Sequence, residues 1–403
     1  MMIFDAHAHL GKRGFAKASS DPLPIFKNAA ENTWPAFARS AEANGVFKAL
    51  VFPFPFPTIN ARRANEYVIE AGRRRADLFL PLLLVSDTPS FIEKHLSEIA
   101  GGKEEFYLPR GRDAKAFFPV YELLQQADKV LLIHPHWEDR VTRIKYIRRN
   151  FPRLRMIMAH SGRKWPFTGD DVLESIVPEL RSVGNLIFDT STIRTPKVIS
   201  GLVKSVGASR VVFGSDCPFY KQKGEDTFKL ELASVTAAGL SDSELESVLR
   251  GTFKRLFLGD RWIRRVRRED AGTLMGLLDE IPPIERKHLA FDKKLEVFRA
   301  NIRAERHILV LENSSGIVGF LRESGRSNGG AMVEELCVSP RHRGLGYGKM
   351  LLHFVQKMFA NLEAKTFSKN STMNCLLERT GFSAPGDQKA KSILVWRWAN
   401  GAE

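Results

Sequence analysis

The sequence predicts an α/β protein in which an N-terminal (β/α)8 barrel of the TIM type is followed by a C-terminal α+β domain. Three observations lead to this prediction. Eight apolar segments alternate with helical segments over roughly 260 residues, which is the size and rhythm of such a barrel. Side chains that can bind metal ions recur where several of these segments end. Near Gly259 and Asp260 the alternation stops and a hairpin pattern begins.

The barrel strands are expected at short apolar runs, and the helices at the amphipathic stretches between them. The expected strands are residues 3–9, 47–52, 79–85, 105–108, 129–133, 154–159, 186–189 and 211–213. The expected helices are residues 34–43, 61–74, 90–100, 120–127, 140–150, 171–183 and 197–206, with a last helical region at 227–257. Pro53, Pro55 and Pro57 cannot continue a sheet ladder, so a loop follows the second strand.

The C-terminal domain is expected to be a smaller sheet with helices. Its expected strands are residues 262–267, 307–311, 317–322, 332–338 and 393–398. Its expected helices are residues 270–278, 284–305 and 349–359, with one further helical stretch before Gly381 and Phe382. Asp270 suits the N-cap of the first of these helices.

Length and charge narrow the class of protein. At 403 residues the chain is too long for one ordinary core, so two domains are expected. The net charge of +15 is interpreted as a solvated basic surface, which would also attract an anionic substrate or coenzyme. No nucleic-acid motif or pattern of stacking aromatics accompanies the arginine clusters, so nucleic-acid binding stays a minor hypothesis.

We expect a cytoplasmic protein with no membrane segment. The longest apolar runs, residues 49–56 and 78–85, are far shorter than the ~20 residues that span a bilayer. A strand-like pattern starts at the second or third residue, which leaves no charged leader and apolar region for a signal peptide. Cys217, Cys337 and Cys375 are too few and too scattered for a disulfide framework.

Five residues at predicted strand ends are candidates for a metal site. Alternate residues of a strand point to the same side, so His7 and His9 bring two imidazoles into one space. His134, His160 and Asp216 end the fifth, sixth and eighth strands. An isolated HxH pair can also be ordinary packing, but function in a (β/α)8 barrel gathers at the C-terminal strand ends.

The ligand types indicate the chemistry. Neutral imidazoles and a carboxylate suit zinc first, with manganese or iron as alternatives. A site with an open position lowers the pKa of bound water toward ~7 and polarises a substrate carbonyl. Asp216 can serve both as a ligand and as the acceptor of the water's proton, while His160 can orient that water or act as acid or base.

Four motifs together resemble the amidohydrolase superfamily, in particular the branch with aminocarboxymuconate-semialdehyde decarboxylase and related hydrolases. They are Asp5-x-His7-x-His9, Ile133-His134, Ala159-His160-Ser161-Gly162 and Gly214-Ser215-Asp216-Cys217-Pro218. The resemblance implies a mononuclear site with His7, His9, His134 and Asp216 as ligands and His160 as a catalytic residue. His136 is the rival of His134, but it follows Pro135 and is expected past the strand end.

The resemblance leaves the number of metal ions open. Two-metal members of the superfamily use a carboxylated lysine or a glutamate on the fourth strand, where this chain reads Lys103-Glu104-Glu105-Phe106. The register of this segment is not fixed by its sequence, and one metal ion is the favoured interpretation. Phosphoesterase barrels also begin with an HxH strand, but the further ligands they need are not found at clear strand ends.

A glycine-rich turn is the distinctive segment of the C-terminal domain. Gly344, Gly346 and Gly348 lie between a strand and a helix, where backbone amides and the helix dipole favour an anion. Such a turn can also be merely flexible. A dinucleotide-binding βαβ unit does not fit, because antiparallel hairpins precede the turn.

Together with Leu336, Cys337, Val338 and Pro340, the glycine-rich turn resembles the acetyl-CoA motif of GNAT-type N-acetyltransferases. The resemblance covers about residues 263–400. The resemblance implies that the backbone of Leu336, Cys337 and Val338 binds the pantetheine arm of acetyl-CoA. The amides of the turn would hold the pyrophosphate, and Asn370 would also contact the coenzyme. The residues of the turn are Arg343, Gly344, Leu345, Gly346, Tyr347, Gly348 and Lys349.

The proton route of acetyl transfer is less well defined. A base must keep the acceptor amine neutral, and Glu334 or Glu335 is the candidate because both precede the coenzyme-binding segment. Solvated or structural glutamates are an equal alternative. Leu377 stands where the family commonly has a tyrosine acid.

The sequence thus predicts a bifunctional enzyme. Residues 1–262 would be a metal-dependent hydrolase of a small carbonyl compound, an amide in particular, and residues 263–403 an acetyl-CoA-dependent N-acetyltransferase. Two alternatives stay open: the barrel is a non-oxidative decarboxylase, or the C-terminal domain is an acyl-CoA-sensing module. The expected partners are small-molecule substrates and acetyl-CoA, and a homo-oligomer is left open.

Overall fold

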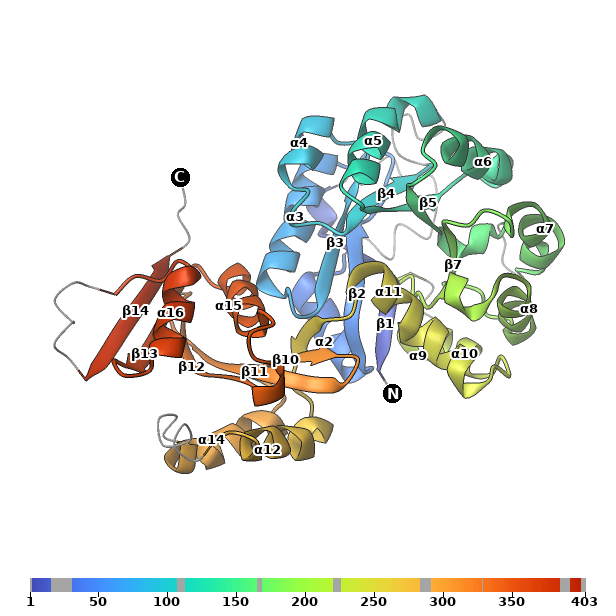
Figure 1. Cartoon of the computed structure of the whole chain (residues 1–403). Helices are drawn as coiled ribbons and strands as arrows, with labels where there is room; N and C mark the ends of the chain where they lie inside the picture. The colour runs from blue at the N-terminus through green and yellow to red at the C-terminus, as the bar shows by residue number, and fades with distance from the viewer. Residues whose placement is uncertain are drawn as a thin grey trace. The chain divides into compact units, whose positions relative to one another are not determined.

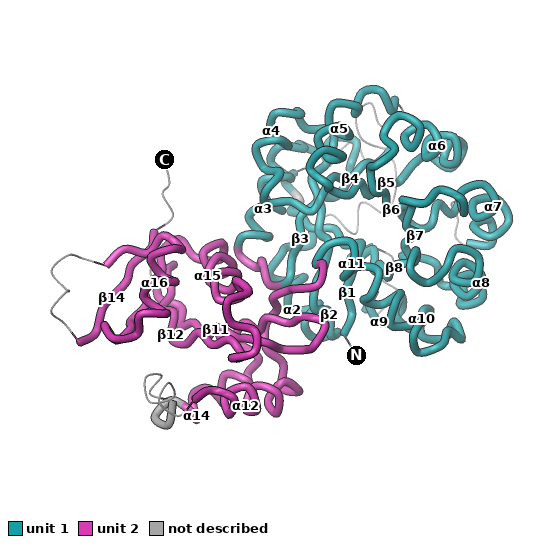
Figure 2. The backbone as a smooth tube through the Cα atoms, viewed as in Figure 1, with its two compact units in different colours: residues 1–73, 78–258 teal, residues 74–77, 259–403 magenta. Residues whose placement is uncertain are grey.

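The chain forms two compact units, which Figure 2 distinguishes by colour. The computed structural model describes residues 2–15, 31–106, 113–164, 169–219, 226–282, 291–327, 329–384 and 392–399. Unit 1 is Met1–Arg73 with Leu78–Leu258, and unit 2 is Arg74–Asp77 with Gly259–Glu403. Each unit has its own sheet and its own hydrophobic core.

Unit 1 contains a parallel sheet of eight strands that neighbour one another in sequence order. The strands are β1 (Ile3–Leu10), β2 (Val46–Pro53), β3 (Phe79–Leu84), β4 (Gly101–Glu105), β5 (Val130–His134), β6 (Arg155–Met158), β7 (Leu186–Asp189) and β8 (Val211–Val212). The N–H of Ala6 donates to the C=O of Phe213, and the N–H of His9 to the C=O of Cys217, both at 2.8 Å. The first strand therefore meets the end of the last, and the predicted barrel is confirmed as nearly closed.

Helices surround the strands of unit 1 (Figure 1). They are α2 (Trp34–Ala43), α3 (Ala61–Arg74), α4 (Pro89–Lys94), α5 (Phe118–Gln126), α6 (Arg140–Asn150), α7 (Val177–Leu180), α8 (Pro196–Val206), α9 (Thr227–Thr236), α10 (Asp242–Glu246) and α11 (Thr252–Phe257). Local signals start several of them: the Thr88 side chain accepts from the N–H of Phe91 at α4, and Ser241 and Glu244 form a capping box at α10. The last helical region, expected over residues 227–257, consists of α9, α10 and α11.

The fourth strand differs from the prediction. It is Gly101–Glu105 rather than residues 105–108, of which 107 and 108 lie outside the described residues. Its sequence, Gly-Gly-Lys-Glu-Glu, carries no apolar side chain, yet all five residues are buried. A Cβ on Gly101 would lie 1.8 Å from the carbonyl oxygen of Val130 in β5, so close strand approach explains the glycine.

Unit 2 contains a sheet of six strands in the order β14-β13-β12-β11-β10-β9. The strands are β9 (Trp262–Arg265), β10 (Ile308–Asn313), β11 (Gly316–Gly325), β12 (Ala331–Val338), β13 (Asn361–Phe367) and β14 (Ile393–Ala399). The helices are α12 (Ala271–Asp279), α14 (Phe291–Arg303), α15 (Tyr347–Met358) and α16 (Ser371–Arg379). Residues 284–290 of one expected helix lie outside the described residues. The α+β character of this domain is confirmed, because all neighbouring strands are antiparallel except β12 and β13.

Strand β13 was absent from the predicted elements. Its buried residues alternate with exposed or partly exposed ones, as in a strand with one face on a core. It pairs in parallel with β12 only from Ala331↔Leu362 to Val333↔Ala364. Both strands continue past this short ladder, and beyond it they no longer pair with each other.

No helix within the described ranges combines the length and apolar character that crossing a membrane would require.

Candidate functional site

The first predicted cluster forms at the C-terminal end of β1. His7 and His9 are both buried, with 1% and 3% of their surface exposed. Asp216 follows β8, and its N–H donates to the C=O of His7 at 2.8 Å. This hydrogen bond brings Asp216 Oδ1 to 3.2 Å from His7 Nε2 and 3.1 Å from His9 Nε2.

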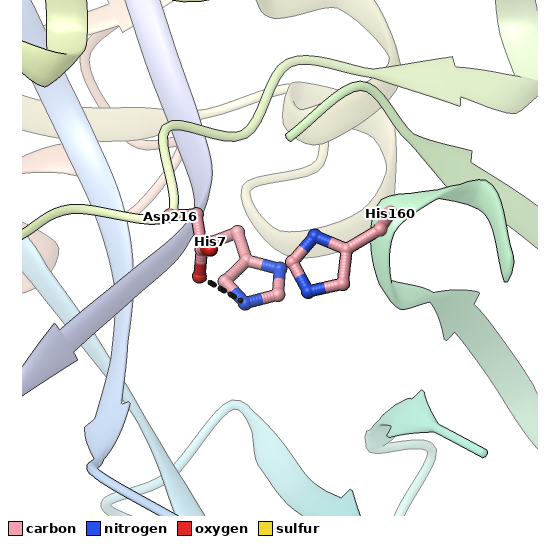
Figure 3. Close-up of side chains that lie close together, drawn as sticks. All are labelled: His7, His160 and Asp216. Carbon is pink, nitrogen blue, oxygen red and sulfur yellow. Dashed lines mark ion pairs between the residues drawn. The ribbon is translucent and has the colours of Figure 1, made fainter. Parts of the chain in front are cut away.

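His160 joins this cluster from the turn after β6. Its backbone has φ 54°, and its ring centroid lies 4.8 Å from that of His7. Each of His7, His160 and Asp216 offers a ligand atom within 4.8 Å of the other two, and all three are buried. Figure 3 shows the two imidazoles side by side, with Asp216 paired to His7. The structure thus brings together residues from three strand ends that the sequence predicts as site residues.

His134 lies beside the cluster and has a partner of its own. Its ring centroid is 4.6 Å from that of His160, while its Nδ1 is 2.8 Å from Glu105 Oε2. The rival His136 instead packs on Trp137 at 3.9 Å between ring centroids, and its Nδ1 is 3.4 Å from Glu138 Oε2.

The register of β4 is now fixed, and it turns Lys103 and Glu105 to the same side. Lys103 Nζ lies 3.5 Å from Glu105 Oε2 and 5.2 Å from the ring centroid of Phe52. Among the described residues, the Lys103 ammonium has this ion pair with Glu105 but no hydrogen-bond acceptor in good geometry. Burial lowers the pKa of Lys103, and Glu105 opposes this effect. Burial raises the pKa of Glu105, but His134 and Lys103 outweigh burial and hold it below its usual value.

The electrostatics of the cluster suit a cation. Burial lowers the pKa of His7, but Asp189 and Asp216 outweigh burial and raise it to about 9. Burial lowers the pKa of His9 to about 4 and that of His160 well below its ordinary value. Burial raises the pKa of Asp216, but His160, His7 and His9 outweigh burial and hold it well below its usual range. Asp189 and Asp216 thus favour a positive charge at His7, and a bound cation would take the place of the proton on its Nε2. Imidazoles and carboxylates are the donors that zinc, manganese and iron accept, so the residues present fit a divalent metal ion.

Sequence reasoning missed Asp189, the last residue of β7. Its Oδ2 is 2.8 Å from His7 Nδ1, on the opposite side of the imidazole from Asp216. The signal was available, because Asp189 ends a barrel strand just as His134 does.

The second predicted site is a cavity of about 940 Å³ in unit 2. Of the predicted coenzyme-binding residues, it is lined by Leu336, Cys337, Val338, Arg343, Gly344, Gly346, Tyr347, Gly348, Lys349 and Asn370. Leu345 is absent from the lining, and 55% of its surface is exposed. Residues 334–338 of β12 and 365–367 of β13 also line the cavity, so it opens where the two strands continue past their short ladder.

The glycine turn is shaped by two left-handed residues. Gly344 and Gly346 have φ 79° and 81°, values that side-chain-bearing residues rarely adopt. Gly346 is the N-cap of α15, so the first N–H groups of this helix begin at the cavity. A helix start with free amide donors favours an anionic group.

The two candidate bases share Arg322 unequally, because its Nη2 lies 2.7 Å from Glu335 Oε1 but 3.8 Å from Glu334 Oε2. Glu335 is buried and forms a bidentate ion pair with the Arg322 guanidinium, in which Arg322 Nη2 lies 2.7 Å from Glu335 Oε1. Glu334 accepts a hydrogen bond from Ser324 Oγ at 2.7 Å and is only partly buried. Both line the cavity, but the carboxylate of Glu335 is occupied by Arg322. Leu377, in place of the family's tyrosine, is fully buried in the core of unit 2.

Comparison with protein families gives two matches. The family described as amidohydrolase matches residues 4–258. The family described as acetyltransferase (GNAT) domain matches residues 304–384. None of the curated proteins matches this chain.

Solved structures resemble the barrel at low sequence identity. A Pseudomonas putida protein assigned as a 2-pyrone-4,6-dicarboxylic acid hydrolase is 16% identical, with a TM-score of 0.51 over 64% of this chain and 97% of its own. An Acinetobacter baumannii protein with the same assignment, holding citric acid, is 14% identical, with a TM-score of 0.51 over 64% and 99%. A dihydroxybenzoic acid decarboxylase from Polaromonas sp. JS666, holding manganese, is 16% identical, with a TM-score of 0.47 over 64% and 96%. Likeness at this level concerns the fold alone.

Proposed function

Because the chain belongs to the amidohydrolase family through residues 4–258, we propose that residues 1–262 are a metal-dependent hydrolase of a small carbonyl compound, an amide in particular. The observation that carries this proposal is the buried cluster of His7, His160 and Asp216. We propose further that residues 263–403 are an acetyl-CoA-dependent N-acetyltransferase. The family match and the GNAT domain indicate an enzyme, and two activities would make it bifunctional.

The metal ion would be held by His7, His9, His134 and Asp216, with zinc as the first choice. Asp216 Oδ1 lies 3.2 Å from His7 Nε2 and 3.1 Å from His9 Nε2. His134 has only Nε2 to offer, because Glu105 holds its Nδ1. When bound, the ion supplies a Lewis acid that polarises a carbonyl and lowers the pKa of water.

His160 and Asp216 would handle protons. Burial keeps the pKa of His160 well below its ordinary value, so its imidazole is neutral and can accept a proton from a water or a substrate. Its Nδ1 is surrounded by acceptors from residues after β7, which leaves Nε2 for this task. The buried position of both residues limits competing contact with bulk water.

A metal-binding and activity experiment tests the barrel proposal. Wild type, H7A and H95A would be stripped of metal, titrated with zinc or manganese, and assayed on N-acyl amines, lactones and aromatic acids. His95 is the matched control, because it follows the last residue of α4, pairs with Glu98 and does not belong to the cluster. Loss of metal binding and hydrolysis in H7A alone is expected. A wild type that retains neither ion contradicts the proposal, and release of carbon dioxide without hydrolysis would favour a decarboxylase.

Acetyl-CoA would bind in the cavity of unit 2. The amides of the turn from Arg343 to Lys349 would hold its pyrophosphate, and the backbone of Leu336 to Val338 its pantetheine arm, with Asn370 as a further contact. Apart from Leu345, these residues line one cavity, although they come from β12, the turn and the start of α16. We propose Glu334 as the base for the acceptor amine, since Glu335 holds Arg322.

A pair of glycine variants tests the coenzyme proposal. G346A and G329A both place a methyl group on a left-handed backbone, with φ 81° and 78°, but only Gly346 lines the cavity. Both variants should therefore lose similar stability, of order 1–2 kcal/mol. Only G346A should weaken acetyl-CoA binding measured by calorimetry. Equal affinities of G346A and wild type would contradict the assignment of the turn.

We also propose that the protein works in the cytoplasm. Its three cysteines, Cys217, Cys337 and Cys375, are all free thiols in the structure, which agrees with a reducing compartment.

A further inference from the structure

The carboxylate of Asp189 lies between two histidines of the candidate metal centre. Asp189 is fully buried at the end of β7. Its Oδ2 is 2.8 Å from His7 Nδ1. Its Oδ1 accepts from the N–H of His160 at 2.9 Å, so the same carboxylate also fixes the backbone that carries the second imidazole.

Ser191 extends this contact to the ring of His160. The Ser191 hydroxyl donates to Asp189 Oδ1 at 2.5 Å, and its oxygen is 2.8 Å from His160 Nδ1. A hydroxyl has a single proton, so an oxygen that has donated it to Asp189 can only accept from His160. His160 must therefore carry its proton on Nδ1.

The other neighbours of His160 Nδ1 require the same tautomer. Thr192 Oγ1 lies 3.1 Å from this nitrogen and donates its own proton to the carbonyl of Ser191. That carbonyl is itself 3.3 Å from His160 Nδ1. Three oxygens with no proton left to give surround this nitrogen, so Nε2 is the atom with the free lone pair.

Asp189 also fixes the proton of His7 on Nδ1. Asp189 Oδ2 accepts from its Nδ1–H, and this leaves Nε2 on the side of Asp216. Figure 3 shows the two rings next to each other. One carboxylate thus reaches two imidazoles that arrive from different strands, directly for His7 and through a hydroxyl for His160.

We propose that Asp189 and Ser191 are a positioning pair that keeps a proton on Nδ1 of both His7 and His160 and aims both Nε2 atoms at the metal centre. This inference rests on the proposed metal-dependent function. A carboxylate that receives the N–H of a metal-binding histidine fixes its orientation, and loss of such a partner typically weakens metal binding by about 10- to 100-fold.

The two residues have separable roles. Asp189 holds a metal ligand, so D189N should weaken zinc binding by about 10- to 100-fold in a competition titration with a chromogenic chelator. Ser191 Oγ lies 2.8 Å from His160 Nδ1 and 3.3 Å from His7 Nδ1, and His7 keeps its shorter contact with Asp189 in S191A. S191A should therefore change zinc affinity much less than D189N does, and lower kcat with little change in KM. S191T keeps the hydroxyl and should restore kcat.

A control separates positioning from general stability. Glu104 is a buried carboxylate on the other side of β4, where it binds Arg143 and Tyr121. E104Q should lower the melting temperature without changing zinc affinity. If D189N loses stability as E104Q does but binds zinc like wild type, Asp189 is a structural residue and the inference is wrong.

The tautomer itself can be measured without any metal. In protein labelled with 15N-histidine, the nitrogen shifts of His160, assigned with H160A, should show Nδ1–H in the metal-free wild type. A mixture of tautomers is expected in the double variant S191A/T192V, which removes both hydroxyl oxygens that accept from Nδ1. An Nε2–H signal for wild-type His160 would overturn the inference whether or not metal binds. A wild type with the Nδ1–H signal but no zinc affinity would instead refute the metal-dependent function.

Discussion

The stability of the barrel should carry a pH dependence that comes from Glu231. This side chain on α9 has 1% of its surface exposed and accepts hydrogen bonds from the N–H of Thr192 and from Arg194 Nε, both at 2.8 Å. It therefore supports the loop after β7 that carries Ser191 and Thr192. The substitution E231Q keeps the shape of the side chain and removes its charge.

The size of the effect follows from burial. Burial raises the pKa of Glu231 from 4.5 to about 7, although Arg194 opposes this effect. At ~1.36 kcal/mol per pH unit, this rise corresponds to about 3 kcal/mol of unfolding free energy. The folded state holds its proton up to about pH 7 and the unfolded state only to about pH 4.5, so stability is lost as the pH rises through this window.

Urea unfolding of wild type and E231Q at pH 5 and pH 8, followed by circular dichroism, measures this contribution. Between these values the wild type should lose about 2.5 kcal/mol more than E231Q. The exposed Glu122 on α5 provides the control E122Q, which should follow the wild type. An equal pH dependence in wild type and E231Q would refute the argument, because Glu231 would then have its ordinary pKa.

Two further predictions concern the reaction and the metal. E334Q should lower the kcat of acetyl transfer by ~10²-fold or more with unchanged acetyl-CoA affinity. E335Q should cost about 3 kcal/mol of stability, because it leaves the buried Arg322 guanidinium with only the more distant carboxylate of Glu334 at 3.8 Å. Steady-state kinetics and chemical denaturation distinguish the two variants, and the reverse pattern would make Glu335 the base. Removal of metal with a chelator should lower the melting temperature of the wild type. Zinc at a hundredfold excess over its dissociation constant should restore ~2.7 kcal/mol of unfolding free energy. A scanning-calorimetry trace that does not respond to zinc, or one that responds equally in H7A, would contradict the metal site.

Local patterns in the sequence were sufficient to predict most of the barrel. β1, β2 and β7 lie within one residue of the expected bounds, because their buried runs differ from the helices in periodicity. The predicted position of β4 was wrong, because its charged residues are buried against partners that are distant in the chain. β13 was overlooked although Leu362, Ala364 and Thr366 alternate with more exposed residues.

Most side chains of the candidate metal centre were also accessible from the sequence. His7, His9, His160 and Asp216 were named because residues at barrel strand ends converge, and the structure places these four side chains together. The convergence is a property of the fold class rather than of any one contact. His134 was named on the same ground, and its ring does lie against His160.

Only the tertiary structure decided how these groups are held. His7 and Asp189 are 182 residues apart in the chain, and no local pattern reports a hydrogen bond over that distance. The same holds for the pairing of Glu105 with His134, and for Arg322, which lies closer to Glu335 than to Glu334. The sequence by itself determined which side chains could do chemistry, because residue type and strand position are local. Which nitrogen, carboxylate or ammonium faces which partner was decided by closure of the barrel and the sheet, because hydrogen bonds depend on positions to within a few tenths of an ångström.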